Sequence, residues 1–200
     1  MAALATLIRA DLAAPALNGL SGLDGAPVVL MVPTPDTALR DEARALVRTA
    51  LRSYLAPLAG CAPEMLPLHT KPGTAPRLDL AGLHVRLSIS HEAGLSLAAV
   101  RVGGRIGVDL MRVAGAALPD WQALAHDYLG PDVAESLLGL DARERPPAFA
   151  RAWTRHEAAL KCLGLQLQEW SPDLARELAL CRTGELALPA AYIGAVALCG

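Results

Sequence analysis

One strictly alternating segment constrains the fold of this chain most. From Leu83 to Ile89 apolar and polar residues alternate without exception, which predicts a half-buried β-strand with its apolar side chains on one face. A glycine turn at 92–94 leads into a second predicted strand, Leu95 to Val102. Gly103-Gly104 then permits a tight turn into a third strand, Arg105 to Met111. Three consecutive strands predict an antiparallel sheet.

Two longer segments have the apolar periodicity of helices. From Asp36 to Ala56 apolar residues recur every three or four positions, Asp36 or Thr37 can cap the start, and Pro57 ends the predicted helix. A second helix is predicted from about Ala148 to Leu163, with Gly164 as its C-terminal stop.

The remaining elements are shorter. A helix is predicted after Pro119, ending near Gly130, and the tail predicts a hairpin of strands 178–182 and 193–199 with a turn at Thr183-Gly184. Each half of the chain thus combines helix with strands. This predicts an α+β fold of two similar lobes, residues 1–104 and 105–200, joined near Gly103-Gly104.

The composition is that of a soluble globular protein. The chain has 200 residues, 53% of them apolar and 19% charged, and a net charge of −2, whereas disordered chains are poor in apolar residues and highly charged. A balance of 18 basic and 20 acidic residues gives no overall field for nucleic acid, and the longest uncharged run, 186–200, is too short to span a membrane. Four cysteines without a Cys-x-x-Cys pair and an N-terminus unlike a signal peptide lead us to expect a cytoplasmic protein.

Two polar sites lie on the predicted strands. Ser90-His91 ends the first strand, where a histidine can meet a phosphate, act as a base or complete a structural hydrogen bond. Asp109 lies within the apolar strand segment Gly107 to Met111. Desolvating a lone carboxylate is costly, so Asp109 requires an ion pair, hydrogen bonds or a metal.

A third polar site lies on the second predicted helix. Glu157 and Lys161 are four residues apart and share a helix face, which taken alone describes an ordinary ion pair of about 0.5 kcal/mol. Lys161 is one of only two lysines among 18 basic residues, so it stands where arginine is the common choice.

Arginines recur every four residues on the first predicted helix, at Arg40, Arg44, Arg48 and Arg52. Like charges at this spacing repel by a few tenths of a kcal/mol per pair. The stripe is therefore either a solvated face or an anion-binding surface.

In order and spacing, these stretches resemble the 4'-phosphopantetheinyl transferase family, in particular its monomeric, surfactin-synthetase-activating type. The matching stretches are the Ser90-His91 turn, Gly107 to Leu110, and Trp153 to Gly164, which is similar to the family pattern Trp-(Ser/Thr)-x-Lys-Glu-(Ala/Ser)-x-x-Lys-x-x-Gly. Gly73 to Leu78 resembles the family's Gly-Lys-Pro segment, so the resemblance covers residues 73–167. It implies two pseudo-symmetric α+β lobes, antiparallel sheets with helices packed on one face, and coenzyme A bound in the cleft between the lobes.

The resemblance also implies an activity. Phosphopantetheine would move from coenzyme A to a serine of an apo acyl or peptidyl carrier protein, giving the holo carrier and 3',5'-ADP. The pathway, whether fatty-acid, polyketide or nonribosomal-peptide synthesis, stays open.

Residue roles follow from the same resemblance. Asp109 and Glu157 would bind Mg²⁺, with Mn²⁺ as a possible substitute, and two acids suffice because Mg²⁺ also takes phosphate oxygens and water. His91 and Ser90 would contact a coenzyme A phosphate. Glu157 is the candidate general base, and Lys161 would steady the transferred phosphoryl group.

Further cations are expected because coenzyme A carries a 3'-phosphate and a diphosphate. Guanidinium groups bind phosphate bidentately, and the candidates are Arg44, Arg48 and Arg77. Carrier proteins of this kind are acidic, so a partner surface is expected at Arg112, Arg143 or Arg151. We expect a monomer that uses neither nucleic acid nor membrane as a partner.

Two residues depart from the family pattern. Many relatives carry an acid two positions after the aspartate, where this chain has Met111, which cannot bind Mg²⁺. The lysine before the glutamate is replaced by His156, which titrates near neutral pH.

These departures leave two alternatives to the transferase. One is a catalytically weak module that binds coenzyme A or a carrier protein. The other is a metal-dependent phosphohydrolase that uses the same carboxylates and needs no carrier.

Overall fold

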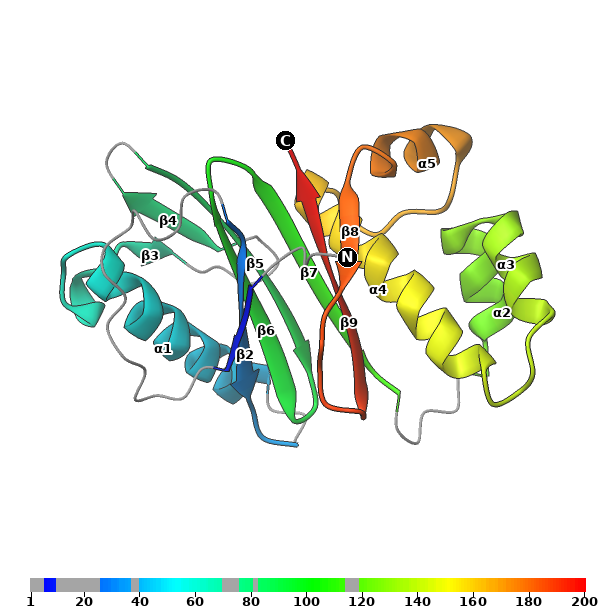
Figure 1. Ribbon diagram of the computed structural model, residues 1–200, viewed down its shortest axis with the longest axis horizontal. Helices are drawn as coiled ribbons and strands as arrows, with labels where there is room; N and C mark the ends of the chain where they lie inside the picture. Colours follow the sequence, from blue (N-terminus) through cyan, green and yellow to red (C-terminus); the bar gives the residue numbers. More distant parts are fainter. Residues whose placement is uncertain (1–5, 10–25, 37–39, 70–75, 81–82, 114–118) are drawn as a thin grey trace.

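The computed structural model describes the chain at residues 6–9, 26–36, 40–69, 76–80, 83–113 and 119–200. Within these ranges the strands form a larger and a smaller sheet (Figure 1). The larger sheet has the order β1 (Thr6–Arg9), β2 (Val28–Pro33), β6 (Leu95–Val102), β5 (Leu83–Glu92), β4 (Arg77–Leu80) and β3 (Leu68–His69). Its pairings are antiparallel except for the parallel pair of β1 and β2.

The smaller sheet has the order β7 (Arg105–Arg112), β9 (Tyr192–Cys199) and β8 (Arg182–Glu185), and its pairings are antiparallel. The helical elements are α1 (Arg40–Leu58), the 3-10 turn η2 (Pro63–Met65), α2 (Trp121–Leu124), the π-helical turn η3 (Ala125–Leu129), α3 (Pro131–Leu138), α4 (Arg145–Leu163) and α5 (Pro172–Leu178). Helices and antiparallel pairing make the fold α+β, as predicted.

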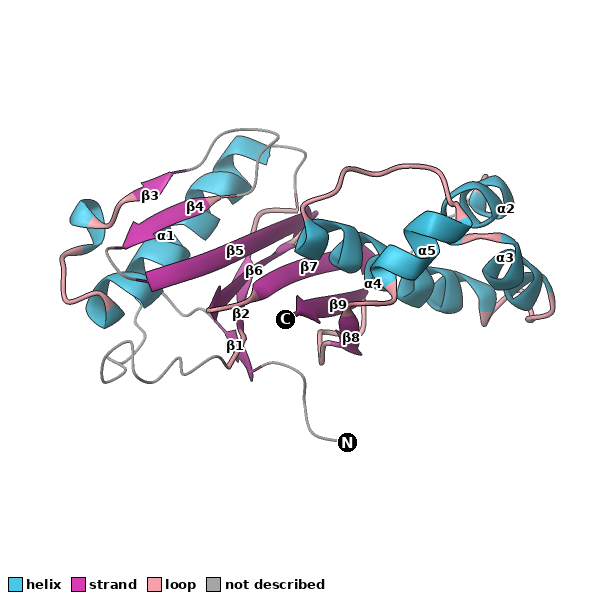
Figure 2. Ribbon diagram, turned by 90° about the horizontal axis from the view of Figure 1, so that it is seen from above, coloured by secondary structure: helices cyan, strands magenta, loops and turns pink. Residues whose placement is uncertain are grey.

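The elements pack in layers, with α1 and α4 on the outside (Figures 1 and 2). One face of the larger sheet packs against α1, through a core that includes Leu30, Leu51 and Leu55. The opposite face of that sheet packs against the smaller sheet, with Leu97 and Val108 in the shared core. Helix α4 covers the far face of the smaller sheet, where small residues allow a close approach: Ala158, Ala159, Cys162, Ala195 and Ala197.

The junction between the sheets is made by β5 and β7. The hydroxyl of Ser88 accepts a hydrogen bond from the backbone N–H of Val108 (3.1 Å), and the hydroxyl of Ser90 accepts one from that of Leu110 (3.4 Å). These bonds satisfy backbone groups on the edge of β7 that does not pair with β9. Each joins residues 20 apart in sequence, so the two strands run side by side in the same direction.

The predicted three-stranded antiparallel sheet is corrected by this arrangement. β5 and β6 pair as predicted, but β7 pairs with β9 in the other sheet. The glycine turn at 103–104 carries the chain from one sheet to the other, and serine side chains of β5 replace a backbone ladder along β7.

The C-terminal hairpin is also corrected. Leu178 ends α5, the first strand is Arg182–Glu185, and the predicted turn residues Thr183 and Gly184 lie inside that strand. Pairing with β9 holds these residues extended despite their turn propensity. The final strand, predicted at 193–199, is confirmed as Tyr192–Cys199.

The helix predictions differ from the structure mainly at the ends. α1 begins at Arg40, Pro57 lies in its last turn, and α4 begins at Arg145, three residues earlier than predicted. Asp36 lies outside α1 and pairs with Arg112 (2.5 Å), whereas Thr37 is outside the described residues. The division at residue 104 and the pseudo-symmetry of two lobes remain predictions.

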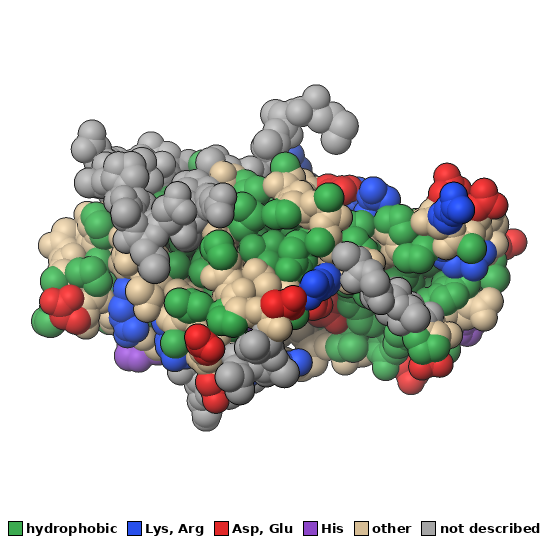
Figure 3. Space-filling model, turned by 90° about the horizontal axis from the view of Figure 1, so that it is seen from below, with side chains coloured by type: hydrophobic (Ala, Val, Ile, Leu, Met, Phe, Trp, Pro, Cys, Tyr) green, Lys and Arg blue, Asp and Glu red, His purple; other side chains and the backbone are tan. Residues whose placement is uncertain are grey.

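The surface mixes charge of both signs, and acidic and basic side chains are interspersed on the face in Figure 3. Over the residues described, none of the helices combines the length and apolar character needed to cross a bilayer.

Candidate active site

The first side chain of the site is Asp109, which β7 directs toward α4. It is buried, with 6% of its surface exposed. Its Oδ1 accepts hydrogen bonds from the Ser90 hydroxyl (2.7 Å) and from the Lys161 ammonium (2.6 Å). The requirement inferred from sequence, that this carboxylate needs partners, is thus met by one residue from β5 and one from α4.

Helix α4 can lie close to β7 because Gly107 has no side chain. A Cβ at this position would lie 1.9 Å from the carbonyl oxygen of Ala158 and 2.4 Å from the backbone nitrogen of Cys162. The helix itself starts with prolines in its first turn and ends at Gly164, whose φ of 77° is the left-handed conformation of a helix C-cap. Gly107 thus sets the distance between α4 and β7, and the prolines and Gly164 set where α4 begins and ends.

Lys161 and Glu157 share the face of α4 that meets β7. Within the described part of the chain, the ion pair of Lys161 is with Asp109 on the strand, so it is not the simple intrahelical pair that the spacing alone describes. The ammonium also donates to the Ser90 hydroxyl at 3.4 Å. Lys161 therefore joins α4, β5 and β7 at one point.

Glu157 lies near enough to Asp109 for the two charges to interact. Burial raises the pKa of Glu157, the negative charge of Asp109 raises it further, and the positive charge of Lys161 lowers it. A carboxyl group with a raised pKa is a better proton acceptor near neutral pH than an ordinary surface glutamate. The repulsion between two carboxylates is also what a bound cation would relieve.

His91, at the end of β5, is surrounded by cations. Its pKa is lowered to about 4, mainly by burial and then by the charges of Arg44, Lys161 and Arg40. Its Nδ1 lies 2.7 Å from the Ser96 hydroxyl. When Nδ1 accepts a hydrogen bond from the Ser96 hydroxyl, Nε2 carries the hydrogen of the neutral ring and can donate a hydrogen bond to an anion.

Positive charge from both halves of the chain therefore gathers beside the two acids. Arg40 and Arg44 come from the start of α1, and Lys161 comes from α4. The arginine stripe of α1 contributes its first two members, Arg40 and Arg44, to the surroundings of His91. Arg44 also pairs with Asp41 on its own helix (2.9 Å).

The other predicted arginines are not joined to this cluster by a contact among the described residues. Arg48 is half-buried on α1, and Arg77 is exposed on β4. Their roles remain predictions, and residues 73–75 of the glycine segment before Arg77 lie outside the described part of the chain.

Both departures from the family pattern lie on the elements that carry the site, Met111 on β7 and His156 on α4. Met111 packs against the apolar cluster that contains Phe149 and Leu137, so its position faces a small helical core. His156 is half-buried, burial lowers its pKa, and within the described residues its Nε2 has no hydrogen-bond partner. Phe149 stacks on Trp153, which steadies this part of α4 (5.7 Å between ring centroids).

Three residues near the site were not singled out from the sequence: Arg40, Ser96 and Glu92. Arg40 was visible only as one member of the arginine stripe, and Ser96 only as a polar residue in an apolar strand. Ser96 faces His91 across the hairpin of β5 and β6, and Glu92 follows His91 directly, whereas the closeness of Arg40 to His91 depends on the packing of α1 against the sheet.

The residues present fit a divalent cation. No group of three or more His, Cys, Asp or Glu side chains within the described ranges is arranged to hold a metal, so an ion here would take two acids and complete its shell with substrate oxygens and water. Both bonds to Asp109 use Oδ1, and no described contact engages Oδ2. Burial raises the pKa of Glu157 most, and the charge of Asp109 raises it further, so the two acids are within electrostatic range of each other.

Chemically, the arrangement can bind phosphate groups, place a base near them and neutralise developing negative charge. His91 and the arginines supply anion-binding groups, Glu157 supplies the base, and Lys161 supplies a compact positive charge.

In the comparison with known proteins, one family model matches part of the chain, less than half of its length. Residues 105–191 match the family described as the 4'-phosphopantetheinyl transferase superfamily. The matched segment contains Asp109, Glu157 and Lys161, whereas Ser90 and His91 precede it. No curated protein matches the chain.

Proposed function

We propose that the protein transfers 4'-phosphopantetheine from coenzyme A to a serine of an apo carrier protein. The match of residues 105–191 to the 4'-phosphopantetheinyl transferase superfamily supports this proposal. The products are the holo carrier and 3',5'-ADP. The observation that carries this proposal is the convergence of Asp109 and Lys161, 2.6 Å apart, with Glu157 beside them and His91 among cations.

Coenzyme A binding falls to the cationic part of the site. His91, Arg44 and Lys161 would contact its phosphate groups, supported by the positive charge that lowers the pKa of His91. Ser90 donates a hydrogen bond to Asp109 and accepts one from Lys161, and it would contact the same phosphates. Arg48 and Arg77 are the further candidates for the 3'-phosphate.

Asp109 and Glu157 would hold Mg²⁺, or Mn²⁺ in its place. When bound, the cation would neutralise negative charge on the coenzyme A diphosphate. Asp109 offers Oδ2 for this contact while Oδ1 keeps its bonds to Ser90 and Lys161.

The transfer step follows from the remaining residues. Glu157 accepts the proton of the carrier serine, the serine oxygen forms a bond to the phosphorus, and the phosphorus–oxygen bond to 3',5'-ADP breaks. Lys161 neutralises charge that develops on the phosphoryl oxygens. The raised pKa of Glu157 supports its role as the base.

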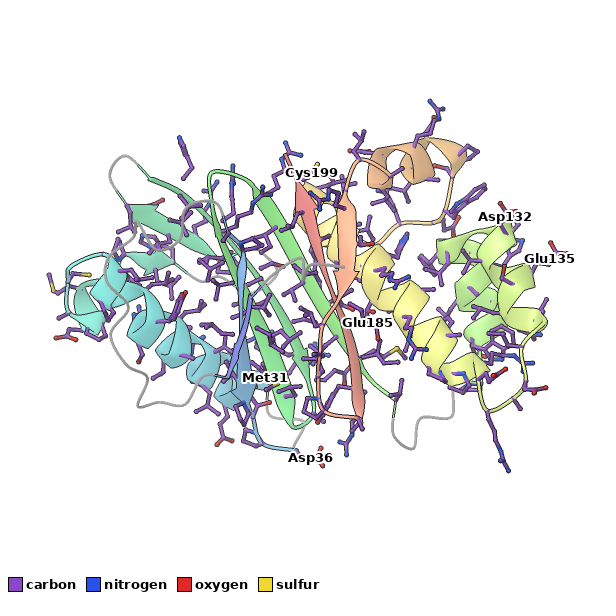
Figure 4. The ribbon with its side chains drawn as sticks, in the orientation of Figure 1. Met31, Asp36, Asp132, Glu135, Glu185 and Cys199 are labelled. Atoms are coloured by element: carbon purple, nitrogen blue, oxygen red, sulfur yellow. The ribbon has the colours of Figure 1, made fainter. Side chains whose placement is uncertain are left out.

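The carrier would bind through charge. Arg143 is exposed on the loop before α4. Arg151 is exposed on α4, and its Nε lies 3.5 Å from Oε1 of Glu185 on β8. Figure 4 labels Glu185. Arg112 is paired with Asp36. We propose that an acidic carrier competes with Asp36 and Glu185 for these arginines.

We further propose that the protein acts as a cytoplasmic monomer and that neither nucleic acid nor membrane is a partner. The four free cysteines support a reducing location.

A mass assay tests the function. The protein is incubated with coenzyme A, Mg²⁺ and each of a panel of apo acyl and peptidyl carriers, and intact carriers are weighed. We expect at least one carrier to gain one phosphopantetheine group, and the gain to vanish with Asp109→Ala. Release of phosphopantetheine without a carrier would show the phosphohydrolase, and binding of coenzyme A without either product would show the binding module.

A further inference from the structure

Ser96 is a polar residue on β6 that no step of the proposed reaction uses. It is fully buried, with 0% of its surface exposed. In the larger sheet it pairs with Val32 of β2 on one side and with His91 of β5 on the other. Val32 offers no polar group, whereas Nδ1 of His91 lies 2.7 Å from the Ser96 hydroxyl. Among the described residues, this hydroxyl therefore depends on the histidine for its hydrogen bond.

The imidazole of His91 is neutral near pH 7. It lies on the face of the larger sheet that packs against α1, as Leu87 does four residues earlier on the same strand. Burial lowers its pKa most, and the charges of Arg44, Lys161 and Arg40 lower it further, to about 4. A neutral imidazole has a single N–H, on either Nδ1 or Nε2. The direction in which His91 can donate therefore depends on which nitrogen holds the hydrogen.

The contact with Ser96 favours the form of the ring that holds its hydrogen on Nε2. If Nδ1 held it, Nδ1 would donate to the serine oxygen, and the hydroxyl hydrogen of Ser96 would be left buried with no acceptor among the described residues. If Nε2 holds it, the hydroxyl donates to Nδ1, and both groups are satisfied. Because an unpaired buried donor costs free energy, Ser96 selects the second form.

The Nε2 atom of His91 is open to a ligand. No contact among the described residues engages it, and it is not one of the buried polar atoms that lack a partner. The charges that act on the ring come from the start of α1, at Arg40 and Arg44, and from Lys161 on α4. An anion attracted by these cations meets the ring at Nε2, because Ser96 occupies Nδ1.

We infer that Ser96 is a positioning residue of the coenzyme A site: it holds Nδ1 of His91 as an acceptor and so directs the single N–H of the ring, on Nε2, toward a phosphate group of the substrate. This inference rests on the proposed function. Ser96 acts through His91 and does not touch the substrate. The arginines and Lys161 supply positive charge, and His91 supplies a hydrogen bond of fixed direction.

NMR of nitrogen-15-labelled histidine tests the inference in the free protein. At pH 7 the nitrogen shifts of a neutral ring show which nitrogen holds the hydrogen, and the spectrum of His91→Ala identifies the His91 signals. We expect the Nε2 form in the wild-type protein and a mixture of both forms in Ser96→Ala. Ser88→Ala is the matched control, because it also removes a buried serine hydroxyl, on the opposite face of the same sheet. It should leave His91 in the Nε2 form.

Calorimetric titration with coenzyme A, without metal or carrier, tests the effect on binding. We expect Ser96→Ala to bind coenzyme A about threefold more weakly than the wild-type protein, because only a fraction of the rings then present an N–H to the phosphate. In a His91→Ala background, Ser96→Ala should weaken binding no further, because a residue that acts through His91 then has nothing to act on.

Four results overturn the inference: the Nδ1 form in the wild-type protein, the pure Nε2 form in Ser96→Ala, the same mixture of forms in Ser88→Ala, or wild-type coenzyme A affinity in Ser96→Ala. An equal loss of affinity when Ser96→Ala is added to His91→Ala also overturns it, because Ser96 would then support the site as a whole. If the wild-type protein does not bind coenzyme A, the proposed function falls, and the NMR comparison still decides whether Ser96 sets the form of His91.

Discussion

The side chain of Glu157 has two opposing effects in the proposed mechanism: its burial beside Asp109 makes the free protein less stable, and its raised pKa suits it to act as the base. Its folded-state pKa is raised, so its contribution to stability is full below the ordinary value of 4.5 and is lost as pH rises through the raised pKa. At neutral pH, burial and Asp109 therefore act against folding.

Glu157→Gln should separate these properties. We expect the melting temperature at pH 7 without metal to rise by about 2 °C because the repulsion is removed. Carrier modification should fall by at least about a hundredfold because the base is lost. Thermal denaturation and the carrier mass assay measure the two effects, and full turnover in this variant would remove Glu157 from the mechanism.

His91 should make the free protein sensitive to acid. Its folded pKa is lowered to about 4 from an ordinary value of 6.5, so its stabilising contribution is full above pH 6.5 and is lost as pH falls toward 4. The groups responsible are the buried surroundings, Arg44, Lys161 and Arg40. We expect the melting temperature of His91→Gln to fall less than that of the wild-type protein when the pH is lowered from 6.5 to 5.

Coenzyme A should act on the same histidine in the opposite direction, because a phosphate next to the ring favours its charged form. The imidazole signals in NMR titrations, with and without coenzyme A, measure both pKa values. A pKa above 6 for His91 in the free protein contradicts this account.

At the scale of elements, the contact between α4 and β7 sets the geometry of the site. Gly107→Ala should cost about 1 to 3 kcal/mol of unfolding free energy, because the new methyl group meets the helix backbone, which cannot move aside cheaply. The matched control is Gly139→Ala, where φ is −71° and the nearest atom lies 3.6 Å from the new Cβ. Chemical denaturation of both variants is the measurement, and equal stability would show that α4 does not rest on Gly107.

The serines of β5 differ in their expected effects although each bonds the edge of β7. Ser88→Ala and Ser90→Ala should each cost about 1 to 3 kcal/mol, because a buried N–H loses its acceptor. Only Ser90→Ala should also weaken Mn²⁺ binding, because only Ser90 holds Asp109. Titration of Mn²⁺ into each variant with coenzyme A present, with free Mn²⁺ followed by electron paramagnetic resonance, measures the difference, and equal metal affinities would deny Ser90 that role.

The elements that sequence predicts well are those with one apolar face. β5 alternates because its apolar residues pack toward α1, whereas its other face is polar and includes the buried serines that bond β7; α1 and α4 have clear helical periodicity. β2 was missed because it is an unbroken apolar run, and both of its faces are covered, by α1 on one side and by the smaller sheet on the other.

At the site, the sequence identified the residues but not their partners. The spacing of Glu157 and Lys161 describes a pair within a helix, whereas Lys161 bonds Asp109, 52 residues earlier. That contact requires α4 to lie on β7, which depends on Gly107 and on strand β9.

At the scale of the whole molecule, docking of an acidic carrier should depend on exposed arginine. Arg143→Glu should raise the carrier KM severalfold at low salt and leave the coenzyme A KM unchanged, because attraction over the surface becomes repulsion. Initial rates at two ionic strengths measure this, with Arg182→Glu on β8 as the charge-matched control. An unchanged carrier KM in Arg143→Glu would show that the carrier docks on another part of the surface.

The pairing of β7 with β9 has a consequence for how the protein matures. The strand that bears Asp109 leaves the ribosome before all the helices of its half, and its backbone partner emerges only after them. Pairing over such a long stretch of chain is intrinsically slow. A nascent polypeptide therefore passes through a period in which His91 is already made but Asp109 and Glu157 have no settled scaffold, so the candidate site forms abruptly, once β9 has been synthesised.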